Sequence, residues 1–276
     1  MLSIPTLEFP SRCFAPALGL PTRVDAGSKA LRRALPLGRD VHVWFLDLHD
    51  MGANATSLLD VAEMSRAQRF VYAHDWRRYV AAHAWLRRIL ASYTGVDARH
   101  LRFATGRHGK PQLAPTRYTD TPLPTFSLSH SKDWALVAVA AGVDVGVDIE
   151  AVRADLPGAD LAAAVLTDGE MAELEASPTV DHAAAFVGCW TRKEACLKAL
   201  GIGLGLEPRA LYAGVHAQRC CVRPKGEGAA GHHVDVAPLP APPGFAAALA
   251  AVDGFANAHH FDDAAKLAAL RLESVC

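Results

Sequence analysis

The hexapeptide VGVDIE, Val145 to Glu150, places two acids inside a run that is otherwise typical of a buried strand. Side chains at positions i and i+2 of a strand point to the same face. Asp148 and Glu150 therefore share one small volume, where two ionised carboxylates without partners would repel each other and lose hydration. The pattern predicts either a strand end whose acids face solvent beside a turn, or a site at which a bound partner neutralises both charges.

A second stretch, WTRKEACLKALG, carries acidic and basic side chains at helical spacing. Trp190, Glu194 and Lys198 recur every four residues and therefore lie along one helix face. The helix is predicted over 182–200 and ends at Gly201, because glycine favours the left-handed conformation that follows many helices. Taken alone, the stretch fits a surface helix with one stabilising Glu-to-Lys pair.

Together, the two stretches predict a metal site. The carboxylates of Asp148, Glu150 and Glu194 are what Mg²⁺ requires when water and substrate phosphate oxygens supply its other ligands. A bound Mg²⁺ would turn a repulsive acid cluster into a satisfied one, and it would lower the charge on a phosphoryl or pyrophosphoryl substrate. The strand and the helix would then each contribute part of one site.

Basic side chains upstream of the acids could hold such a substrate. Arg66 and Arg78 flank an expected break between two helical segments, and Lys110 follows a glycine-rich turn. His130 lies between two serines in the run SLSHS. Each has an ordinary alternative, because exposed Arg and Lys are usually solvated and a single His is more often a satisfied turn or core residue.

The composition restricts the class of protein. The 276 residues are 51% hydrophobic and 21% charged, with a formal net charge of −1, so no general basicity favours nucleic acid or an anionic membrane. The six cysteines include no CxxC pair, which favours free thiols in a reducing cytosol. No secretory signal or membrane-spanning run is present in the pattern. We therefore expect a cytoplasmic protein that binds neither nucleic acid nor membrane.

Hydrophobic periodicity predicts the same order of elements in both halves of the chain. After a lead-in of about 40 residues and a first strand at 41–48, helical spacing runs over 57–93, and it returns after a capping-box pattern at Thr167 and Glu170. Strand-like runs follow each helical region, at 101–104, 126–129, 134–140 and 145–152 and then at 211–217, 232–237 and 244–252. Helix followed by strands occurs twice, which predicts a duplicated α+β unit.

Three finer expectations concern local structure. The strands at 126–129, 134–140 and 145–152 are close enough in sequence to be neighbours in one sheet. The first helical region is expected to break near His74 and Asp75. Segments rich in Ala, Gly and Pro, at 157–164 and 226–244, are expected to form loops.

Taken in order along the chain, these motifs resemble the large, surfactin-synthetase type of 4′-phosphopantetheinyl transferase. The resemblance rests on GKP at 109–111, SHS at 129–131, VGVDIE at 145–150 and WTRKEACLKALG at 190–201, and it spans about 65–205. The family signature is a G-x-D-x-E strand followed by a W-x-x-K-E-x-x-x-K helix. One departure precedes the helix break, where Glu63 and Ser65 occupy positions at which the family often has Lys or Arg.

The resemblance implies an α+β fold of two similar halves related by pseudo-twofold symmetry, residues 1–143 and 144–276, with the active site in the cleft between them. It implies transfer of the 4′-phosphopantetheine arm of coenzyme A to a serine of an acyl or peptidyl carrier protein, with release of adenosine 3′,5′-bisphosphate. Coenzyme A and the apo carrier protein are the implied partners, and Mg²⁺ is the implied cofactor. A monomer is sufficient, because one chain supplies both halves.

The same resemblance implies a role for each candidate residue. Asp148, Glu150 and Glu194 would hold Mg²⁺, and Glu194 would take the serine proton, directly or through a water. Lys198 and His130 would meet the phosphates during catalysis. The other implied coenzyme A contacts are Ser129 beside His130, Arg66 and Arg78 at the 3′-phosphate, and Gly109, Lys110 and Pro111 at the adenine end.

Two other functions are compatible with the sequence. A different Mg²⁺-dependent phosphoryl or nucleotidyl transferase would use the same acids, although neither GxxxxGK[ST] nor a kinase signature is present. A non-catalytic module that binds coenzyme A or a carrier protein would not need all three acids. Carriers of fatty acid, polyketide and nonribosomal peptide assembly all fit the implied reaction.

Overall fold

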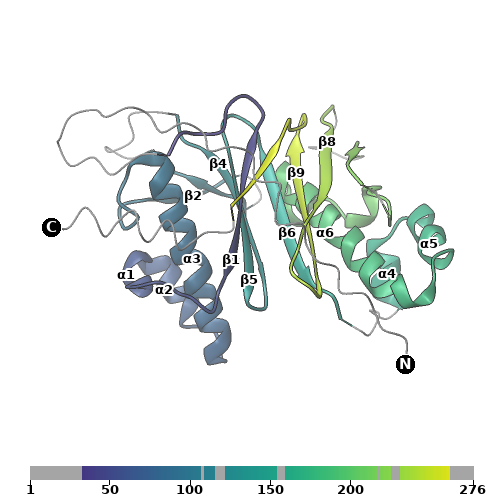
Figure 1. Ribbon diagram of the computed structural model, residues 1–276, viewed down its shortest axis with the longest axis horizontal. Coiled ribbons are helices and arrows are strands. Elements are labelled where there is room, and N and C mark those ends of the chain that lie inside the picture. Colours follow the sequence, from purple (N-terminus) through teal and green to yellow (C-terminus); the bar gives the residue numbers. More distant parts are fainter. Residues whose placement is uncertain are drawn as a thin grey trace, which may run out of the picture.

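The computed structural model describes residues 33–106, 109–115, 122–153, 159–216, 218–224 and 231–261. Two four-stranded sheets pack against each other at the centre, and a long helix covers the outer face of each sheet (Figure 1). The protein is therefore α+β, as the sequence predicts. Within the described ranges, no helix combines the length and the apolar character that crossing a membrane requires.

The first sheet has the strand order β10-β1-β5-β4. Its strands are β1 (Val41–Asp47), β4 (Thr125–Ser131), β5 (Trp134–Ala140) and β10 (Ala258–Phe261), of which only β10 pairs in parallel. The long helix α3 (Ala73–Thr94) covers this sheet, after the short helices α1 (Ala55–Leu58) and α2 (Val61–Ala67). The apolar stripe predicted for α3 is buried against the sheet; it comprises Tyr79, Ala82, Leu86 and Leu90.

The second sheet is antiparallel throughout and has the order β6-β9-β8-β7. Its strands are β6 (Val145–Ala151), β7 (Cys220–Val222), β8 (Val234–Leu239) and β9 (Phe245–Val252). Helix α6 (His182–Leu200) covers its outer face. The remaining elements are the hairpin of β2 (Phe103–Thr105) and β3 (Pro111–Leu113), helices α4 (Ala159–Val165) and α5 (Asp168–Glu175), and short 3-10 turns at Thr179–Asp181, Gly203–Gly205 and Pro208–Ala210.

Strand β6 lies between the core of the two sheets and helix α6. Its alternate residues suit these two environments. Val145, Val147 and Ile149 are buried in the core between the two sheets. Alternate residues of a strand point the other way, toward α6 in this case. The approach of the helix is so close that a Cβ at Gly146 would lie 2.1 Å from the backbone oxygen of Ala195. The glycine of VGVDIE thus allows α6 to reach the strand that carries the two acids.

Lys110 ties the β2–β3 hairpin to the end of α6. Its Nζ donates to the carbonyl oxygen of Ala199 and to Oδ1 of Asp144, each at 2.9 Å. The last carbonyls of a helix have no partner within the helix and carry a partial negative charge, so a lysine stabilises this end. Gly201 terminates the helix with φ 64°, as the sequence predicts. The hairpin of the first half is therefore held to the long helix of the second.

Several elements confirm the sequence-based expectations. Helix α6 has the predicted bounds, and α3 ends at Thr94 before the left-handed Gly95. Thr167 and Glu170 form the predicted capping box at the start of α5. The strands at 41–48, 134–140, 232–237 and 244–252 are present with small shifts at their ends. The expectation of a loose lead-in falls mainly on residues 1–32, which lie outside the described residues.

The expected neighbourhood of β4, β5 and β6 in one sheet is wrong in part. β4 pairs with β5, whereas β6 pairs with β9 in the second sheet. The edge of β6 that faces β4 is satisfied differently, because the backbone N–H of Val147 donates to Ser127 Oγ and that of Ala151 donates to Ser131 Oγ. Serine hydroxyls replace the backbone ladder that sequence proximity suggested.

Three local predictions are also wrong. The first helical region breaks at 68–72, and His74 and Asp75 lie within the first turn of α3. The segments 157–164 and 226–244, expected as loops, contain most of α4 and all of β8, and the Ala and Leu residues of α4 have high helix propensity. No strand forms at 211–216. The carbonyls there accept from Arg192 and two of the N–H groups donate to Glu170, so these backbone groups are not available for a sheet.

The buried His42 on β1 makes the stability of the fold dependent on pH. It is 5% exposed and its Nδ1 lies 2.8 Å from Tyr93 Oη. Burial, with help from the nearby charges of His259 and Arg33, lowers the pKa of His42 from 6.5 to about 4. The unfolded chain therefore takes up this proton first as the pH falls, and the free energy of unfolding should drop by about 3 kcal/mol between pH 7 and 4.

Urea unfolding of the wild type and of His42→Gln at both pH values tests this expectation. The variant lacks the titrating group, so its loss of stability on acidification should be smaller than that of the wild type by about the same 3 kcal/mol. Equal losses in the two proteins would contradict a buried, neutral His42.

Candidate active site

Asp148 is the most deeply buried acid of the predicted site, with 2% of its surface exposed. Its Oδ1 accepts from Lys198 Nζ at 2.7 Å and from Ser129 Oγ at 2.8 Å. Its Oδ2 is buried and has no hydrogen-bond partner among the residues that the structure describes. A buried carboxylate oxygen without a partner is costly, so this atom favours a ligand that would supply positive charge.

Glu150 and Glu194 are close enough to Asp148 to share its electrostatic field. Burial raises the pKa of each carboxyl, and the charge of Asp148 raises both further. Glu194 also feels the charge of Glu150. The repulsion expected from VGVDIE is therefore present, and the strand and the helix 44 positions apart in the chain do contribute to one acidic cluster.

The cluster fits a hard divalent cation only with help from other ligands. Within the described part of the chain, no three His, Cys, Asp or Glu side chains are arranged to hold a metal ion by themselves. Mg²⁺ is commonly held by one or two carboxylates together with water and substrate phosphate oxygens. The partnerless Oδ2 of Asp148 and the two neighbouring carboxyls fit that mode of binding.

A group of cations adjoins the acids around His130. The imidazole is at the surface of β4, but surrounding protein atoms desolvate it and lower its pKa, and four nearby basic side chains lower the pKa further. These groups belong to His83, Lys198, Arg66 and Arg78. The structure therefore brings four predicted residues together, from α2, α3, β4 and α6. Such a group suits an anion with several phosphates.

His83 belongs to this group although the sequence did not single it out. Its ring stacks on Tyr79 with centroids 4.0 Å apart, and its Nδ1 lies 3.1 Å from Glu63 Oε1. Arg66 also contacts Tyr79, since its guanidinium carbon lies 5.8 Å from the centroid of the Tyr79 ring. The available signal was the spacing of Tyr79 and His83, which places both on one face of α3.

Two of the predicted substrate contacts are already engaged. Arg78 donates to both carboxylate oxygens of Asp133, at 2.9 and 3.1 Å, and more weakly to Asp75. Lys110 is 12% exposed and is held at the end of α6. Gly109 has a φ of 91°, which glycine adopts without strain, and Pro111 begins β3. The contacts of Arg78, Gly109, Lys110 and Pro111 with coenzyme A stay predictions, and the turn residues 107–108 lie outside the described ranges.

The departure at Glu63 has a structural explanation. Glu63 forms a capping box with Asp60 at the start of α2. Its Oε2 also accepts from Arg87 Nε at 2.7 Å, and the guanidinium of Arg87 is fully buried. Arg87 in turn donates to the carbonyls of Ala98 and Leu101. A lysine at position 63 would repel Arg87, so in this chain the position supports the fold of the first half.

The lysine of the W-x-x-K-E signature is part of the fold as well. Lys193 and Glu170 form a fully buried ion pair at 2.5 Å. Lys193 Nζ also donates to the carbonyls of Val165 and Pro208. Arg192 beside it holds the carbonyls of the segment 213–215. Of the predicted helix face, Glu194 and Lys198 lie beside Asp148, whereas Trp190 packs at the edge of a small apolar cluster.

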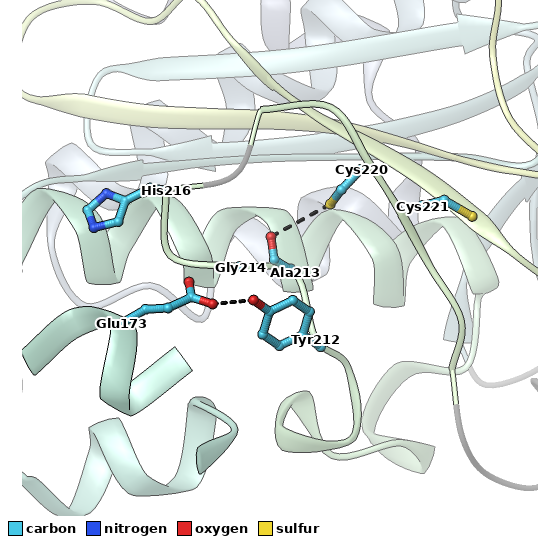
Figure 2. Close-up of a pocket in the computed structure, with 7 residues that line it drawn as sticks. All are labelled: Glu173, Tyr212, Ala213, Gly214, His216, Cys220 and Cys221. Carbon is cyan, nitrogen blue, oxygen red and sulfur yellow. Dashed lines mark hydrogen bonds between the residues drawn. The ribbon is translucent and has the colours of Figure 1, made fainter. Parts of the chain in front are cut away.

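A separate hollow of about 230 Å³ lies in the second half of the protein. Figure 2 shows its lining residues: Glu173, Tyr212, Ala213, Gly214, His216, Cys220 and Cys221. Tyr212 Oη donates to Glu173, and Cys220 Sγ lies 3.7 Å from the carbonyl oxygen of Ala213. None of the predicted site residues lines this hollow, so the acidic cluster is a different place on the molecule.

Fold and site together define a class: an α+β protein that gathers carboxylates beside cations where two sheets meet. Comparison with known proteins narrows this class. A model of the 4′-phosphopantetheinyl transferase superfamily matches residues 144–239, and a model of the N-terminal part of 4′-phosphopantetheinyl transferase matches residues 48–142. The chain belongs to the 4′-phosphopantetheinyl transferase superfamily.

Three relatives indicate how far the similarity extends. The 4′-phosphopantetheinyl transferase HetI of Nostoc sp. is 34% identical over 171 residues, 61% of this chain and 71% of that protein. The L-aminoadipate-semialdehyde dehydrogenase-phosphopantetheinyl transferase of Mus musculus is 28% identical over 157 residues, 54% of this chain and 50% of the relative. AcpT of Salmonella typhi, a 4′-phosphopantetheinyl transferase, is 42% identical over 96 residues, 35% of this chain and 47% of the relative. The chain thus spans about half the length of the last two.

Proposed function

We propose that this protein is a phosphopantetheinyl transferase of the large, surfactin-synthetase type, which moves the 4′-phosphopantetheine arm of coenzyme A to a serine of an acyl or peptidyl carrier protein. Adenosine 3′,5′-bisphosphate is the other product. Membership of the superfamily supports the reaction. The observation that carries it in this chain is the buried, partnerless Oδ2 of Asp148 beside two further carboxyls and a cationic group.

The residues of the site divide the work by charge. We place Asp148, Glu150 and Glu194 at Mg²⁺, which when bound would neutralise charge on the pyrophosphate of coenzyme A. Lys198 and His130 lie at the junction of acids and cations, where they would contact phosphate oxygens. Glu194, whose pKa is raised by burial and by Asp148, is suited to accept the proton of the carrier serine.

Phosphoryl transfer of this kind needs no covalent intermediate with the protein. The leaving group is already part of a pyrophosphate, so positioning and neutralisation of charge can supply most of the rate enhancement. The chain contributes by orienting the substrate beside the site residues of β4, β6 and α6 and by taking one proton. We further propose that the protein works as a monomer. We also propose a reducing cytosol as its compartment, which the free thiols of Cys189, Cys196, Cys220 and Cys221 support.

Incubation with coenzyme A, Mg²⁺ and an apo carrier protein, followed by mass spectrometry of the carrier, tests the reaction. We expect a gain of one phosphopantetheine group on one serine, lost when Mg²⁺ is chelated or when that serine is replaced by alanine. If neither an acyl nor a peptidyl carrier protein is modified while coenzyme A still binds, the non-catalytic binding module becomes the better description.

Lys198→Ala should weaken the use of coenzyme A. Lys198 Nζ lies 2.7 Å from Asp148 and 3.0 Å from Ser129 Oγ, and a third of its side chain remains exposed to an incoming phosphate. Loss of one charge-assisted hydrogen bond corresponds to a KM for coenzyme A that is higher by about tenfold to a hundredfold. Arg99→Ala is the matched control, because it removes an exposed cation that is paired with the neighbouring Asp97. Equal KM values in the two variants would remove Lys198 from the site.

A further inference from the structure

Three serines alternate along β4, and all three turn toward β6. Ser127, Ser129 and Ser131 share one side of the strand because they are two residues apart. Phe126 and Leu128, between them, pack into the core beneath α3. The run SLSHS therefore directs hydroxyls at the strand that carries the acids, although the two strands belong to different sheets.

The three hydroxyls do different things. Ser127 Oγ accepts from the backbone N–H of Val147 at 3.1 Å and, within the described ranges, makes no hydrogen bond to an acid. Ser129 Oγ donates to Asp148 Oδ1. Ser131 makes both kinds of contact: it accepts from the N–H of Ala151 at 3.2 Å and donates to Glu150 Oε2 at 2.9 Å. The hydroxyl of Ser131 therefore bridges the backbone of Ala151 and the side chain of Glu150.

The carboxylate of Glu150 needs such a tether. Glutamate has three rotatable side-chain bonds, and holding it in one conformation costs entropy. The charge of Asp148 repels Glu150, whereas Lys198, which is bound to Asp148, and Arg153, three positions further along, attract it. Without a fixed donor, the carboxylate would be free to move away from Asp148, because the repulsion by Asp148 exceeds the attraction by either cation. Ser131 opposes that movement, and its own hydroxyl is oriented by the backbone of Ala151.

We propose that Ser131 is a positioning residue that holds Glu150 beside Asp148, so that both carboxylates can meet a divalent cation. The proposal rests on the proposed function, whose metal ligands include Glu150. Groups that orient metal ligands through hydrogen bonds commonly change metal affinity by 10- to 100-fold when they are removed. Ser131 acts through Glu150 and does not itself meet the substrate.

Binding of Mn²⁺ to the full-length protein, with and without coenzyme A, measures the effect independently of transfer. Free Mn²⁺ can be followed by electron paramagnetic resonance. We expect Ser131→Ala to raise the dissociation constant of Mn²⁺ by about tenfold or more, and Ser131→Thr, which keeps the hydroxyl, to bind nearly as the wild type does. In the transfer assay, Ser131→Ala should need more Mg²⁺ for half-maximal rate while keeping most of its kcat at saturating Mg²⁺.

Ser127→Ala is the matched control, because it also removes one strand-to-strand hydrogen bond but no contact with an acid. Both alanine variants should lose a similar, small amount of thermal stability, and only Ser131→Ala should lose Mn²⁺ affinity. Equal Mn²⁺ affinities in the two variants, or a wild type that binds no Mn²⁺ in either condition, would overturn the proposal. Normal Mn²⁺ behaviour without carrier modification would overturn the proposed function instead and leave the role of Ser131 standing.

Discussion

Glu194→Gln should lower the rate of phosphopantetheine transfer by about two to four orders of magnitude, the usual contribution of a general base. The substitution keeps the shape of the side chain and removes its charge and its basicity. Because burial and Asp148 raise the pKa of Glu194, its ionised form is unfavourable in the folded protein without a cation. The metal-free variant should therefore unfold at a temperature equal to or above that of the wild type.

Transfer rate and thermal unfolding measured on the same preparations separate catalysis from folding. Glu175→Gln is the matched control, because Glu175 is exposed at the end of α5 and the chemical change is identical. It should alter neither the rate nor the unfolding temperature. A Glu194→Gln protein with an unchanged rate, or one with a large loss of stability, would show that this acid has a structural and not a catalytic role.

Lys193→Met should destabilise the protein by about 3–5 kcal/mol, the usual cost of removing one partner of a buried ion pair. Lys193 and Glu170 are both fully buried. Burial alone would raise the pKa of Glu170, but Lys193 and the donated backbone hydrogen bonds lower it, so the carboxyl is charged in the fold. Without Lys193, that charge would stay unpaired in the interior, and the carbonyl of Pro208 would lose its hydrogen bond to α6.

Denaturant unfolding of three variants tests this expectation. The double variant Glu170→Gln with Lys193→Met should recover much of the lost stability, because it leaves no unpaired charge. Arg209→Ala breaks the exposed pair with Asp168 and should cost less than about 1 kcal/mol. If Lys193→Met were as stable as Arg209→Ala, the buried pair would not be what holds the second half together.

Elements with strong local patterns could be predicted from the sequence. The 3.6-residue spacing of α3 and α6, the capping box at Thr167 and the glycines after each long helix fix helices through contacts within about four residues of chain. Predictions were wrong where groups distant in sequence determine the conformation of the backbone. Residues 211–216 have strand-like composition, but Arg192 and Glu170 take their hydrogen-bonding groups.

The candidate site shows the same division. The i and i+2 spacing of Asp148 and Glu150 predicted that they share a face, and the structure places both beside Glu194. Three contacts could not be predicted, because each depends on which strands and helices become neighbours. They are the position of His83 near His130, the hydrogen bond from Ser131 to Glu150 and the ion pair of Arg78 with Asp133. Lys193, which sequence proximity to Glu194 would associate with the site, turns instead into the interior.

By itself, the sequence determined which side chains of VGVDIE lie on one face and which residues of α6 lie on one stripe, since both follow from the repeat of the backbone. Only the tertiary structure decided that β6 pairs with β9 in the second sheet and contacts β4 through serine hydroxyls. It also decided how close Glu194 comes to the acids of β6, because the missing side chain of Gly146 lets α6 pack directly on that strand.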